Sequence, residues 1–134
     1  MAATFFSGFK DQKSALNFLL DNIYTGFQIH NSICVVLKDE RQQENFKKAQ
    51  QQKYFENSKL EYLYDKNISF IAEEPSSPFD EIHIFSDKVM KLSAELSDEV
   101  YVYTTSSDEA VNKASRELYA NLKKDNFELK HEAI

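Results

Sequence analysis

Glycine, proline and cysteine are scarce in this chain of 134 residues, and tryptophan is absent. Two glycines and two prolines are too few for a loop-rich or turn-dense all-β fold. The single cysteine, Cys34, excludes a disulfide framework within the chain and favours a reducing compartment. Because Cys34 lies in the aliphatic run 33–37, with nothing nearby to stabilise a thiolate, we expect a buried strand thiol and no nucleophile.

The motifs of nucleotide-binding, metal-binding and hydrolytic proteins are also missing. Gly8 and Gly26 stand alone, outside any G-x-G-x-x-G or G-x-x-x-x-G-K pattern. The three histidines, His30, His83 and His131, have no metal-ligand spacing, and we expect His83 to be a hydrogen-bonded strand residue and not a base. No nucleophile elbow is present. The sequence therefore predicts a non-catalytic protein with no cofactor and no metal ion.

Long hydrophobic runs are lacking too, and the charge is unevenly distributed. No stretch is apolar enough to span a bilayer and no basic leader precedes one, so we expect a cytoplasmic protein without a membrane contact. The net charge is −6, and residues 60–110 carry 12 acidic against 3 basic side chains. Strong direct binding to nucleic acid is disfavoured, because it needs many cations on one surface. A small cationic pocket for a short acidic peptide remains compatible with this distribution.

The hydrophobic pattern predicts alternating strands and helices in one domain, residues 1–134. The expected strands are 2–6, 33–37, 67–71, 81–85 and 100–104. The expected helices begin at Asp11, at Asp39, at Ser86 or Asp87 with Val89, Leu92 and Leu96 inward, and at Ser106 through a Ser106–Glu109 capping box. This order predicts a three-layer α/β/α fold with a mostly parallel sheet of about five strands, Rossmann-like without a dinucleotide motif.

The final helix carries the most specific signal. One face is apolar, with Val111, Ala114, Leu118 and Leu122 at helical spacing. The opposite face carries Lys113, Arg116, Ala120 and Lys123, and Tyr119 and Asn112 lie on the flank between the two. Guanidinium and aromatic groups together clamp a carboxylate and an apolar side chain, so we expect Arg116, Tyr119 and Phe127 to form a binding site.

These C-terminal residues resemble a known family. Residues 114–119 read A-S-R-E-L-Y and residues 126–129 read N-F-E-L, similar to the A-R-E-R-Y-type helix and G-F-N-L that close the chi subunit of bacterial DNA polymerase III. Earlier segments are similar in the same order: A-T-F-F at 3–6, D-E-R-Q at 39–42 and S-F-I at 69–71. The chain departs from the family by an apparent insertion around 50–60, a short segment before the fourth strand, and Asn112 and Ala120 in place of two lysines.

The resemblance implies a non-catalytic adaptor of the clamp loader in DNA replication. Chi subunits bind the acidic, Phe-ended C-terminal tail of single-stranded DNA-binding protein, and they also bind the psi subunit. Carried over to this chain, Arg116 would hold a tail carboxylate and Tyr119 would flank it. The family also places aromatic residues near that pocket at the positions of Tyr64 and Phe70, and Phe127 matches by motif. Lys113 and Lys123 would supply steering charge.

Two other classes remain open from the sequence. The chain could be a small flavodoxin-like α/β enzyme or nucleotide-binding domain, with its site in the crevice at the strand ends. It could also be an immunity-type protein-interaction domain that uses the acidic surface of residues 60–110.

Overall fold

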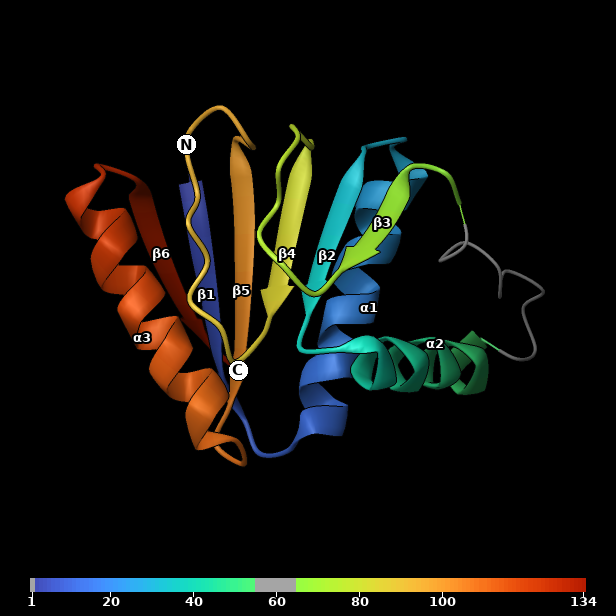
Figure 1. Cartoon of the computed structure of the whole chain (residues 1–134). Helices are drawn as coiled ribbons and strands as arrows, with labels where there is room; N and C mark the ends of the chain where they lie inside the picture. The colour runs from blue at the N-terminus through green and yellow to red at the C-terminus, as the bar shows by residue number, and fades with distance from the viewer. Residues whose placement is uncertain (1, 55–64) are drawn as a thin grey trace.

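The protein is built around one parallel sheet of six strands (Figure 1). The computed structural model describes residues 2–54 and 65–134, and the side chains of 49–54 are outside the description. The strand order is β3-β2-β4-β5-β1-β6, and every neighbouring pair is parallel. The strands are β1 Ala2–Phe9, β2 Ile33–Leu37, β3 Ile68–Ile71, β4 Glu81–Phe85, β5 Glu99–Thr105 and β6 Glu128–Ala133. Parallel strands need crossover connections, which explains the low glycine count.

Helices cover both faces of this sheet, so the predicted three-layer α/β/α fold is confirmed. Helices α1 (Gln12–Gln28) and α2 (Glu40–Tyr54) lie on one face, where Leu19, Leu20, Ile23 and Phe46 are buried against β2 and β4. Helix α3 (Glu109–Lys124) lies on the other face and buries Leu118 and Leu122 against Ala3, Phe5 and Val102. No helix among the described residues is long and apolar enough to cross a membrane.

Helix α3 starts and ends through local hydrogen bonds. Its N-cap is Asp108, whose carboxylate accepts from the Val111 N–H at 3.2 Å. The sequence predicted Ser106 as the N-cap, which is wrong: the helix begins two residues later, because Asp108 accepts the hydrogen bond from the first turn. At the other end Asn126 adopts a left-handed conformation, with φ 63°, and the Phe127 N–H donates to the Leu122 carbonyl. This turn reverses the chain into β6.

The predicted helix after Ser86 is wrong: residues 86–98 run across the α3 face of the sheet in irregular conformation. Met90 is buried in the core of that face, and Leu92 and Leu96 pack against it. In this segment backbone N–H groups donate to side chains instead of to helical carbonyl groups. The Ser86 hydroxyl, for example, accepts from the Lys88 N–H. The Lys91 N–H likewise donates to the carboxylate of Glu74. The segment thus covers the sheet without a helix.

Strand β6 was not predicted from the sequence, and it completes one edge of the sheet. Its side chains are largely exposed and carry no alternating apolar pattern, so the sequence lacked a strand signal. It pairs with β1 from Ala2↔Glu128 to Ser7↔Ala133. The pairing ends next to Gly8, where a glycine is required. Its φ is 93°, and a Cβ at this position would lie 2.7 Å from the carbonyl oxygen of Ile134.

Candidate functional site

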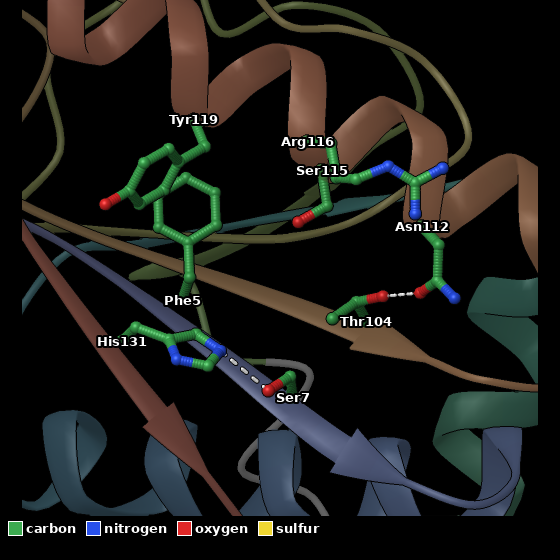
Figure 2. Close-up of a pocket in the computed structure, with 8 residues that line it drawn as sticks. All are labelled: Phe5, Ser7, Thr104, Asn112, Ser115, Arg116, Tyr119 and His131. Carbon is green, nitrogen blue, oxygen red and sulfur yellow. Dashed lines mark hydrogen bonds between the residues drawn. The ribbon is translucent and has the colours of Figure 1, made fainter.

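A cavity of about 370 Å³ lies between α3 and the sheet (Figure 2). Strands β1, β5 and β6 supply one wall and α3 supplies the other. The lining residues are Phe5, Ser7, Thr104, His131, Asn112, Ser115, Arg116 and Tyr119. The volume falls in the lower part of the range of small-molecule sites, about 300–1,000 Å³. Arg116 and Tyr119, predicted from the sequence, thus share one cavity.

The amphipathic pattern of α3 positions these two side chains. Its buried face anchors the helix on the sheet through Val111, Ala114, Leu118 and Leu122. Positions 112, 115, 116 and 119 follow i, i+3, i+4, i+7 spacing on the flank next to that face. Because the buried face fixes the rotation of the helix, this flank overhangs the strands and forms the upper wall of the cavity.

Two aromatic rings form the apolar end of the cavity. The Tyr119 ring packs edge-to-face on the Phe5 ring, with centroids 5.1 Å apart and planes at 72°. Phe5 is buried in the core below, which holds its ring in place, whereas Tyr119 is 38% exposed. The exposed part of the Tyr119 ring, supported from below by Phe5, is an aromatic surface that can receive another ring.

Arg116 supplies the positive charge of the cavity. Its Nη2 lies 3.0 Å from Oε1 of Glu109, two turns earlier on α3. Both side chains are highly exposed, 66% and 80%, so solvent screens the pair and it contributes little to stability. A guanidinium has five N–H donors, so Arg116 retains donors for an anionic ligand while one nitrogen contacts Glu109.

Neutral polar groups and a histidine form the remaining wall. The Ser7 hydroxyl lies 2.7 Å from His131 Nε2, and the Thr104 hydroxyl donates to the side-chain carbonyl of Asn112 (Figure 2). Sequence reasoning missed Phe5, Ser7, Thr104 and His131 as site residues. The strands that carry them are far apart in the sequence, and only the register of β6 on β1 brings His131 to the cavity.

The other predicted site residues lie elsewhere. Lys113 and Lys123 are exposed on α3 beside the cavity but do not line it. Phe127 is a core residue, 7% exposed. The prediction that Phe70 lies near α3 is wrong, because it belongs to β3 at the opposite edge of the sheet and packs against Phe46 of α2. Tyr64 lies outside the described residues.

A second polar cluster lies on the opposite face, under α1. Asn22 donates to the Tyr103 hydroxyl at 3.0 Å, that hydroxyl lies 2.7 Å from His83 Nδ1, and His83 Nε2 lies 2.9 Å from Glu81. Asn31 donates to the other carboxylate oxygen of Glu81 at 2.7 Å. When Tyr103 donates to Nδ1, a neutral imidazole donates its Nε2–H to the carboxylate, and every group has a partner.

Burial and hydrogen bonds act in opposite directions on the pKa values of this cluster. Burial lowers the pKa of His83, although the hydrogen bond to Glu81 acts in the opposite sense. At Glu81 burial acts to raise the pKa, but the hydrogen bonds from His83 and Asn31 outweigh burial, so the pKa of Glu81 is lowered below its usual value. The prediction that His83 is a hydrogen-bonded strand residue is confirmed. The cluster neighbours a second cavity of about 350 Å³ whose wall includes Tyr101, Glu81 and Glu99.

The described part of the chain contains neither a cluster of metal-ligating side chains nor a reactive thiol. No group of three or more histidine, cysteine, aspartate or glutamate side chains among residues 2–54 and 65–134 could hold a metal ion. Cys34 is fully buried, as predicted, and burial raises the pKa of its thiol to about 12. The thiol therefore stays protonated at neutral pH.

A scan against models of protein families finds no match to this chain, and no curated protein matches it either.

Proposed function

We propose that this protein is a chi-like, non-catalytic adaptor that binds the acidic, Phe-ended C-terminal tail of single-stranded DNA-binding protein and links it to the clamp loader in DNA replication. The observation that carries the proposal is the cavity under α3, where the Arg116 guanidinium and the Phe5–Tyr119 aromatic pair line one space. Both α3 residues belong to the A-S-R-E-L-Y segment that resembles the chi family.

The chemistry of such a tail matches the two ends of the cavity. A terminal phenylalanine needs an apolar surface for its ring, and the exposed part of Tyr119, which packs on Phe5, supplies one. Its carboxylate needs a cation, and Arg116 offers a planar set of donors suited to bidentate contact. Acidic residues that precede the phenylalanine would lie in the field of Lys113 and Lys123, which are exposed on the same helix.

Titration of the protein with a fluorescently labelled acidic peptide ending in phenylalanine tests the proposal. We expect saturable binding, and Arg116→Ala should weaken it about tenfold or more because a charge-assisted contact is lost. Lys113→Ala should cost less and should mainly reduce the salt dependence, since a rim charge acts through screened attraction.

Arg41→Ala is the matched control for this titration, because it removes the same charge from α2 on the opposite face of the sheet. Its affinity should equal that of wild type. If Arg116→Ala binds the peptide as tightly as wild type in low salt, the site has been assigned to the wrong residues.

The proposal also assigns a place in the replication machinery. Because chi subunits bind psi, we propose a psi partner within the clamp loader, a cytoplasmic location, and no strong direct binding to nucleic acid. In co-purification from the cells that produce it, the wild-type protein should bring single-stranded DNA-binding protein to the clamp loader. Arg116→Ala should still join the clamp loader but should bring much less of that partner.

Thermal-shift measurements separate the adaptor from a flavodoxin-like enzyme. No nucleotide, flavin or divalent metal ion should stabilise the protein saturably, because the sequence has no phosphate-binding glycine loop. A clear, saturable rise in the melting temperature with any of these ligands would favour the enzyme.

A further inference from the structure

The wall of the cavity opposite α3 contains a histidine that the proposed function leaves unassigned. His131 pairs in register with Phe5 of β1. Because side chains alternate along a strand, His131 projects from the same face as Phe5 and Ser7, into the space under α3. The contact of 2.7 Å between Nε2 and the Ser7 hydroxyl fixes the orientation of its ring.

Among the eight lining residues, His131 is the one that can gain a positive charge near neutral pH. Arg116 is permanently charged, and Thr104 and Asn112 are neutral and bonded to each other. Imidazole changes charge between about pH 5 and 8, whereas serine and threonine hydroxyls do not. A carboxylate in the cavity can thus contact Arg116, which is always charged, and His131, which is charged when it is protonated.

We propose that His131 is a second anchor for the carboxylates of the bound tail and that it takes up a proton when the tail binds. The inference rests on the proposed function and names a regulation of that site: affinity rises as pH falls. The Ser7 hydroxyl permits both states, because it donates to a neutral imidazole nitrogen and accepts from a protonated one.

The charged neighbours of His131 favour this coupling. Arg116 is the charged side chain that lines the cavity from α3, and Tyr119 is the other titratable group there. Strands β1 and β5 contribute only the neutral Ser7 and Thr104 besides Phe5. On β6 the adjacent Lys130 and Glu132 point to the other face of the sheet. None of the eight lining residues carries a carboxylate, so a ligand carboxylate beside His131 would favour the charged imidazole.

Peptide titrations at constant ionic strength between pH 8 and pH 5.5 test the inference. For wild type we expect the affinity for an acidic, Phe-ended peptide to rise about tenfold over this range, as a charge-assisted contact forms. His131→Gln should lose this pH response, so that its affinity for the peptide changes little between pH 8 and pH 5.5. Calorimetry at pH 7 in two buffers of different ionisation enthalpy should show proton uptake by wild type and none by His131→Gln.

His30→Asn is the matched control, because His30 is exposed at the end of α1 and its φ of 62° is a conformation that asparagine accepts. This variant should keep the full pH response. An equal pH response in wild type and His131→Gln would overturn the inference and leave the proposed function standing. If wild type binds no peptide at any pH, the proposed function fails and the inference fails with it.

Discussion

Arg116 already has an anionic partner in the protein, and this contact bears on the proposed binding site. Its partner Glu109 holds one guanidinium nitrogen at 3.0 Å. The carboxylate of a ligand would be the second anion near Arg116, so it must share the guanidinium with Glu109 or displace it. An exposed ion pair is weak, so the displacement costs little, but it is a cost that binding has to overcome.

Removing this competitor should strengthen binding. We expect Glu109→Gln to raise the affinity for the acidic, Phe-ended peptide about two- to threefold, because both repulsion and competition at Arg116 are lost. Peptide titration in low salt measures the effect. Glu117→Gln removes the same charge from α3 without breaking the contact to Arg116, so it should change the affinity less. Equal effects of the two substitutions would show that net charge alone matters.

Sequence reasoning could find only those site residues that lie within one element. Arg116 and Tyr119 are three positions apart on a helix, so their spacing alone predicted that they act together. Phe5, Thr104 and His131 come from three strands, and no local pattern links them. Phe70 was assigned by resemblance alone, and the strand order separates it from α3 by the width of the sheet.

At the scale of the element, α3 is the part that builds the site. Asp108 caps the helix and so fixes where its first turn begins, one turn before Asn112 enters the cavity wall. The sequence predicted this helix well because its hydrophobic period is regular and its flanks are polar. The segment 86–98 also carries leucines at helical spacing, and the sequence therefore predicted a helix there. It is irregular instead, because it crosses the sheet and because side chains bind its backbone N–H groups.

Loss of this cap should destabilise the protein. We expect Asp108→Ala to lower the free energy of unfolding by about 1 kcal/mol, because the Val111 N–H loses its acceptor. Urea denaturation monitored by circular dichroism measures the change. Asp108→Asn is the control, since asparagine is an equally good N-cap but has no charge. A loss as large in Asp108→Asn as in Asp108→Ala would show that the charge, and not the cap, stabilises the helix.

At the scale of the whole molecule, the two faces of the sheet hold different groups of polar side chains. The α3 face carries the cavity lined by Arg116 and Tyr119, while the α1 face contains the chain of hydrogen bonds from Asn22 to Glu81. Gly26 of α1 is part of this arrangement, because a Cβ at that position would overlap the carboxylate of Glu81. The strand alternation was visible in the sequence, but this close approach was not, since it depends on how α1 packs on β4.

The buried cluster should make the whole fold sensitive to acid. The pKa of His83 is lowered in the folded state, so below about pH 6.5 the unfolded chain takes up a proton that the native protein resists. The pKa of Glu81 is lowered as well, so its contribution is present above about pH 4.3 and is lost as the pH falls through the folded value. Both groups bind protons more readily when unfolded, and both effects therefore have the same sign.

We accordingly expect the free energy of unfolding to decline continuously as the pH is lowered from about 7 to 4, first through His83 and then through Glu81. Urea denaturation at half-unit pH steps measures this curve. Glu81→Gln should flatten the lower part, below about pH 5, because the titrating carboxylate is gone while His83 still resists protonation. Glu99→Gln is the matched control, since Glu99 pairs with Glu81 across the strands but lies outside the hydrogen-bonded chain, and it should leave the curve close to that of wild type. A wild-type protein as stable at pH 5 as at pH 7 would contradict the protonation states assigned to the cluster.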